Sequence, residues 1–134
     1  MLLLWAGHLI VNNVQFSHVV PGRHTLKLTA KKVVGQKILN IQDVRGQYAD
    51  WLFTSKNITL NTLRHIVNLG KMTMHCMQPQ VQIQAKEGVL NLQTNKAVIQ
   101  FARLTHRNMI FTCPQATYDH QQKTITCLNG RMTI

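Results

Sequence analysis

Apolar and polar residues alternate along this chain with the period of two that is typical of β-strands. Four segments show the alternation most clearly, each placing large apolar side chains and then a small one on the same face: Leu26–Ala30, Trp51–Ser55, Val81–Ala85 and Met109–Cys113. No window of the sequence keeps the i, i+3, i+4, i+7 spacing of an amphipathic helix for three turns. The pattern therefore predicts an all-β chain.

The four segments recur at a nearly regular interval. Their small residues are separated by 25, 30 and 28 positions: Ala30, Ser55, Ala85 and Cys113. In the last three copies a turn follows, and then a return strand: His65–Leu69, Ala97–Phe101 and Thr124–Leu128. An internal period in this range marks stacked supersecondary units. We therefore expect about four strand-pair repeats.

The repeats leave no linker, so the pattern predicts a single β-domain over residues 13–134, preceded by an apolar segment over residues 1–12. A strand pair buries one face only, so stacked repeats must share a continuous interior, in either a closed barrel or a folded-over jelly roll. Met1–Val11 is shorter than the roughly 20 residues that span a bilayer. It is a buried first strand, the trailing end of a membrane anchor, or a short interfacial anchor.

The charge balance points to an anionic partner. The chain carries 15 Lys and Arg residues against four acids, which gives a formal net charge of +11. Such an excess favours nucleic acid, phosphorylated lipid or an anionic membrane face, and the alternative is a solvated basic surface. The cations are scattered, with Lys31-Lys32 the only adjacent pair. That distribution indicates a rim of isolated cations.

Catalytic chemistry is not evident in the sequence. The four acids and seven histidines are dispersed, and no nucleophile motif, phosphate loop or metal-ligand spacing is present. We therefore expect no enzyme activity, no metal and no cofactor. Of the three cysteines, Cys113 and Cys127 flank a predicted hairpin. They either form a disulfide or, like Cys76, serve as small buried apolar residues.

The repeats resemble a known family. The segments W-L-F-T-S-K-N-I-T-L (Trp51–Leu60) and L-G-K-M-T-M (Leu69–Met74) are similar to the periplasmic β-domain of the LptC and LptA lipopolysaccharide-transport proteins, also called OstA-like. The last copy (Ala116–Ile134) and the first (Gly22–Val33) match the same family pattern. Within the family the chain is most like LptC, because four copies begin near its N-terminus.

The resemblance implies a twisted antiparallel β-jelly roll that is open at both edges. It also implies non-enzymatic binding of lipopolysaccharide, whose acyl chains would lie in an apolar groove inside the roll. Carried over to this chain, the groove-lining residues are Trp51, Phe53, Ile58, Leu60, Val81, Ile83, Leu90, Phe111 and Tyr118.

The expected partners follow from the same resemblance. An LptA-like bridge protein and an inner-membrane ABC transporter of the LptB/LptF/LptG type would join the roll by edge-strand addition, and no nucleic acid is expected. The location would be the periplasm of a Gram-negative bacterium, with an anchor in the inner membrane. The residues alone leave two other functions open: a basic nucleic-acid-binding β-domain, and a structural β-repeat module with a dry core.

Overall fold

The computed structural model describes residues 9–77, 80–122, 124–128 and 131–133, which form twelve β-strands. Within these residues there is no helix with the length and apolarity needed to cross a membrane. The strands are β1 (Leu9–His18), β2 (Leu26–Gly35), β3 (Ile38–Tyr48), β4 (Trp51–Asn61), β5 (Ile66–Leu69), β6 (Met72–Met77), β7 (Gln80–Ala85), β8 (Glu87–Asn91), β9 (Lys96–His106), β10 (Met109–Asp119), β11 (Thr124–Leu128) and β12 (Arg131–Thr133).

Each long strand bends at its middle. In β2, Ala30 and Val33 are both buried, and the two lysines between them are exposed. The pairing of β2 with β3 skips one residue on each strand at this point, Lys31 and Asp43. Asp43 has a positive φ of 51°, as expected for a residue at a bulge. The two successive outward residues reset the alternation, so one strand supplies inward side chains to two facing sheets.

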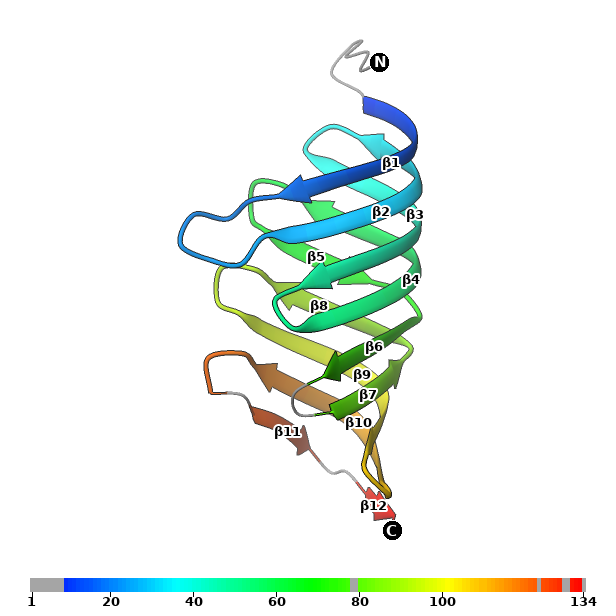
Figure 1. Cartoon of the computed structure of the whole chain (residues 1–134), viewed down its shortest axis with the longest axis vertical. Helices are drawn as coiled ribbons and strands as arrows, with labels where there is room; N and C mark the ends of the chain where they lie inside the picture. Colours follow the sequence, from blue (N-terminus) through cyan, green and yellow to red (C-terminus); the bar gives the residue numbers. More distant parts are fainter. Residues whose placement is uncertain (1–8, 78–79, 123, 129–130, 134) are drawn as a thin grey trace.

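The bends of neighbouring strands line up and divide the hydrogen-bonded strands into two antiparallel sheets. The first sheet holds residues 14–18, 26–30, 44–48, 51–55, β6, β7, 102–106, 109–113 and β12. The second holds residues 9–12, 32–35, 38–42, 57–61, β5, β8, 96–100, 115–119 and β11. We call the line of bends, on the right in Figure 1, the corner. We call the opposite side, where hairpin turns of the two sheets face each other, the mouth.

The small residues of the sequence repeat lie along the inside of the corner. Ala30, Ser55, Ala85 and Cys113 are each buried and each is the last inward residue of the first sheet before the bend. The two sheets come closest together along this line, so a large side chain there would push them apart. The small residues of the sequence repeat therefore mark the corner, where each long strand bends from one sheet into the other.

One buried cluster fills the space between the sheets, and both sheets contribute to it. Its largest fully buried side chains are Leu26, Ile41, Ile58, Leu60, Ile83 and Leu92. Burying one such side chain stabilises the fold by about 1.5–3 kcal/mol. The interior is thus continuous from β2 to β10, as the stacked-repeat pattern predicts.

Two expected strands differ in length from those observed. The return strand predicted at residues 97–101 continues to His106 as β9, because the bend at Phe101 is a bulge that leaves the strand unbroken. The return strand predicted at residues 65–69 begins at Ile66, because His65 has a positive φ of 57° and ends the preceding turn. The strand predicted at residues 124–128 is β11.

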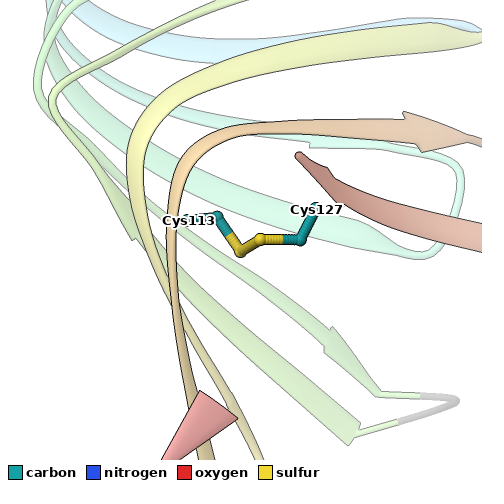
Figure 2. Close-up of a disulfide and its surroundings, with 2 residues drawn as sticks. All are labelled: Cys113 and Cys127. Atoms are coloured by element: carbon teal, nitrogen blue, oxygen red, sulfur yellow. A yellow bond between two sulfur atoms is a disulfide. The ribbon is translucent and has the colours of Figure 1, made fainter. Parts of the chain in front are cut away.

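A disulfide links β10 and β11 near the C-terminal end of the roll. Cys113, inside the corner on β10, is bonded to Cys127 on β11, with their Cα atoms 5.6 Å apart (Figure 2). Cys76 is buried among core residues and takes no part in this disulfide. Of the two alternatives open for Cys113 and Cys127, the structure therefore has the bonded pair. Disulfides of this kind persist in oxidising compartments.

The close packing at Gly46 provides a test of the inner face. A Cβ atom at Gly46 would overlap the ring of Phe53 on the neighbouring strand. Gly46→Val should therefore lower the free energy of unfolding by about 1–3 kcal/mol, measured by chemical denaturation. The neighbouring Gln47 is exposed, and Gln47→Val should change stability by less than about 0.5 kcal/mol. Equal effects of the two substitutions would contradict the inward register.

Candidate functional site

All nine side chains predicted to line a groove lie on the inner face of the roll. Seven are buried, none more than 7% exposed: Trp51, Phe53, Ile58, Leu60, Val81, Ile83 and Leu90. The other two, Phe111 and Tyr118, are partly buried and pack against the same core. The first sheet supplies five of them and the second sheet four, so the set spans both walls of the interior.

These side chains belong to the buried apolar cluster between the sheets. None of the nine lines either of two surface hollows, one on the outside of the corner and one at the β1–β3 edge. Most of the nine side chains are therefore enclosed by the protein's own apolar residues. A guest molecule would have to enter where the two sheets separate, and the mouth is the side where no strand crosses from one sheet to the other.

The connection between β1 and β2, residues 19–25, lies across the mouth. Arg23 Nε donates a hydrogen bond to the backbone oxygen of Gln93 in the β8–β9 turn, at 2.6 Å. The ring of His24 packs edge-on against His120, with centroids 5.0 Å apart, and against Tyr48 at 5.8 Å. The connection thus joins the first sheet to two turns of the second.

A pair of histidines joins the sheets beside this connection. His18 Nε2 and His65 Nδ1 lie 2.7 Å apart, and their ring centroids are 5.0 Å apart. A ring hydrogen bond needs an N–H on one nitrogen and a free lone pair on the other, so at least one imidazole must be neutral. Burial lowers the pKa of His18, and the charge of His65 lowers it further. The contact therefore favours the neutral form of His18.

Tyr48 makes a third contact across the mouth, between the first sheet and the β8–β9 turn. Its hydroxyl donates a hydrogen bond to Asn95 Oδ1, and both side chains are buried. Burial raises the pKa of Tyr48, an effect that the charge of Arg23 partly offsets. The backbone N–H of His120 donates to the backbone carbonyl oxygen of Asn95 at 2.9 Å. We call these side chains the mouth seam: His18, His24, Tyr48, His65, Asn95 and His120.

Trp51 lies just inside the seam. Its ring packs edge-on against Tyr118 of the opposite sheet, with centroids 5.1 Å apart. The Tyr118 hydroxyl lies 2.8 Å from His120 Nδ1, which links the pair to the seam. Trp51 Nε1 is buried and has no hydrogen-bond partner among the residues that the structure describes. A buried donor left unpaired costs about 1–3 kcal/mol, so Trp51 is positioned to donate to an acceptor that enters at the mouth.

The inner face was predictable from the sequence, whereas the mouth seam was missed. Its histidines are far apart in the sequence, His18 and His65 being 47 positions apart. The only signal was that several of them lie at or beside predicted turns, which a folded-over roll gathers on one side. No group of three metal-ligating side chains suited to hold an ion occurs in the described part of the chain.

The His18–His65 contact predicts a pH dependence. Because the pKa of His18 is lowered in the folded state, the unfolded chain binds more protons in mildly acidic solution. Stability should therefore fall as the pH is lowered from about 7.5 to about 5.5, measured as the thermal midpoint. His18→Gln should reduce this fall, and His106→Gln, outside the seam, should leave it unchanged. An identical pH profile for His18→Gln and the parent would contradict the assignment.

Comparisons with known proteins identify the fold. No family model matches the chain, and no curated protein matches it by sequence. Among solved structures it is similar to the crystal structure of LptH, the LptA-homologous periplasmic component of the conserved lipopolysaccharide transport device from Pseudomonas aeruginosa. The TM-score is 0.70 at 13% sequence identity, over 81% of this chain and 94% of that one. The chain therefore has the twisted antiparallel β-jelly-roll fold of that protein, as the sequence predicts.

Proposed function

We propose that this chain is a non-enzymatic lipopolysaccharide-binding component of an envelope transport bridge, most like LptC within the LptC and LptA family. The observation that supports it best is the continuous apolar interior, enclosed by two sheets in the same fold as a lipopolysaccharide-transport component. An interior of this kind suits acyl chains, because each CH₂ group buried there gains about 0.8 kcal/mol.

The nine inward residues form the proposed acyl-chain site. Phe53 and Ile83 line one wall and Leu60 the other, and these side chains separate to admit the lipid. Trp51 Nε1 supplies an unpaired donor near the mouth, where an ester oxygen of an acyl chain would accept its hydrogen bond.

Entry at the mouth is the least costly route. Opening the corner would break backbone hydrogen bonds along the long strands, whereas opening the mouth breaks the contacts of the seam and of Arg23 and separates apolar side chains such as Trp51 and Tyr118. The seam consists of a few side-chain contacts, including the one between His18 and His65. The lipid would therefore displace the connection at residues 19–25.

Both edges of the roll suit strand addition. Among the described residues β1 pairs with β2 alone, and β11 and β12 pair with β10 alone. Edge strands carry unpaired backbone donors and acceptors that accept a strand from another chain. We propose that an LptA-like bridge protein joins one edge and an inner-membrane ABC transporter of the LptB/LptF/LptG type joins the other. The disulfide between Cys113 and Cys127 is consistent with a periplasmic location.

One observation favours a different function. The interior side chains pack into one buried apolar cluster, which suits a structural β-module with a dry core. The two functions differ in whether the interior takes up lipid, and the next experiment separates them.

Photo-crosslinking tests the acyl-chain site. A photoreactive residue placed at Phe53, Ile83 or Phe111 should capture lipopolysaccharide, because all three face the interior. The same residue at Lys96, whose side chain is exposed on the second sheet, is the control and should not. Capture at Lys96 alone would refute the interior site, and absence of capture at every position would favour the dry structural module.

Edge pairing has its own test. A photoreactive residue at Gln15, exposed on β1, should capture the purified bridge protein or the purified transporter. Gln82 is also exposed, but it lies on β7 between two paired strands, so the same residue there should capture neither protein. Equal yields at the two positions would argue against strand addition at β1.

A further inference from the structure

Three lysines meet on the outside of the corner. Met72 on β6 pairs with Ser55 on β4 and also with Ala85 on β7. The residues next to them line one hollow: Lys56 on β4, Lys71 just before β6 and Lys86 just after β7. All three are exposed, and they lie fifteen positions apart in the sequence. We call them the corner lysines.

The corner lysines belong to a larger basic surface. They line a hollow of roughly 910 Å³ together with Lys31, Arg45 and Arg103, and Asp43 is the only acid in its lining. None of these six cations forms an ion pair within the part of the chain that the structure describes. The hollow is on the outer side of the corner, so it is separate from the interior and does not depend on the function proposed above.

This arrangement is unfavourable for the protein alone. Like charges gathered in one hollow repel one another, most strongly at low ionic strength. Six cations with Asp43 as the only acid in the lining make the hollow a site of concentrated positive charge. An anion bound there would remove the repulsion.

Phe101 adds an apolar surface to the hollow. Its ring is 61% exposed, and Lys86 Nζ lies over it at 5.2 Å from the centroid. Its φ of 52° belongs to the bulge at the bend of β9. An exposed aromatic ring beside cations suits a ligand that has both anionic groups and an apolar face.

Polar side chains lie between the cations. Arg45 pairs in register with Thr54, and Arg103 with Gln84, and Thr73 lies between Thr54 and Gln84. The outer surface therefore offers hydroxyl and amide groups in the middle and a guanidinium group at each end. Guanidinium groups bind phosphate oxygens in a bidentate manner, and lysines bind them as point charges.

We propose that this hollow binds a compact sugar that carries several phosphate groups. The corner lysines, Arg45 and Arg103 bind the phosphates, Thr54, Thr73 and Gln84 bind the hydroxyls, and Phe101 packs against the C–H face of the sugar ring. The ligand is either a soluble sugar phosphate or the phosphorylated headgroup of a glycolipid. Single-stranded nucleic acid fits less well, because it needs a succession of stacking aromatic rings and Phe101 is the only aromatic residue in the lining.

Binding is tested by calorimetry on the full chain. The probes are glucose 1,6-bisphosphate, phosphatidylcholine vesicles containing a bisphosphorylated disaccharide lipid, and a single-stranded oligonucleotide. Lys56→Gln/Lys71→Gln/Lys86→Gln should weaken sugar-phosphate binding at least about tenfold. The matched control, Lys27→Gln/Lys37→Gln/Arg64→Gln, removes the same net charge elsewhere and should stay within about twofold of the parent.

The probes that bind distinguish a soluble sugar phosphate from a lipid headgroup. Binding of the soluble bisphosphate supports a free sugar phosphate, and binding of the vesicles alone supports a headgroup. Equal losses in the two triple variants would refute a defined site. Tighter binding of the oligonucleotide, with the same dependence on the corner lysines, would refute the sugar assignment.

Thermal stability gives a second readout that needs no ligand. Removal of the corner lysines should raise the thermal midpoint at low ionic strength, because it relieves repulsion, and the gain should shrink in about 1 M salt. The bisphosphate should raise the midpoint of the parent and not that of the triple variant. A lower midpoint for the triple variant at low ionic strength would contradict the repulsion on which the proposal is based.

Discussion

The fold depends on a one-residue shift in side-chain phase at the middle of each long strand. Side chains in a strand alternate with a period of two, so an uninterrupted strand would bury one face along its whole length. The pair of outward residues at the bend, Lys31 and Lys32 in β2, brings the apolar residues of the second half onto the same inner side as those of the first. Without this shift the two sheets would have no common interior. Because the shifts line up from strand to strand, the chain folds over along a single line.

The two sides of the molecule differ as a result. Covalent strands and backbone ladders cross the corner, so it holds the sheets together and presents an outward row of charged positions. Among the described residues the mouth is closed by side-chain contacts and by the connection at residues 19–25, with His18–His65 and Tyr48–Asn95 as the main polar links. The proposed uptake of lipid therefore opens the roll at the mouth and keeps its corner fixed. The proposed acyl-chain site and the proposed phosphate site therefore lie on opposite sides of the same wall.

Alternation along a strand is local, and so the inner face could be predicted from the sequence, down to Phe53 and Ile83. The features that were missed depend on which distant strands become neighbours. In the sequence the corner lysines are scattered cations, because only the pairing of β4, β6 and β7 brings them to one hollow. The histidines of the seam are dispersed in the sequence for the same reason. Cys113 and Cys127 remained ambiguous until the register of β10 and β11 was known.

The central claim is that the interior takes up lipid by separation of the sheets at the mouth, and a distance across the mouth tests it most directly. Spin labels at Gln47→Cys and Thr94→Cys, in a Cys76→Ala background, report the separation of the two sheets by double electron–electron resonance. Labels at Thr29→Cys and Asn40→Cys, on the two sides of the corner, are the reference pair. Lipopolysaccharide should lengthen the first distance and leave the second unchanged. Saturating lipopolysaccharide binding with no change across the mouth would contradict the account.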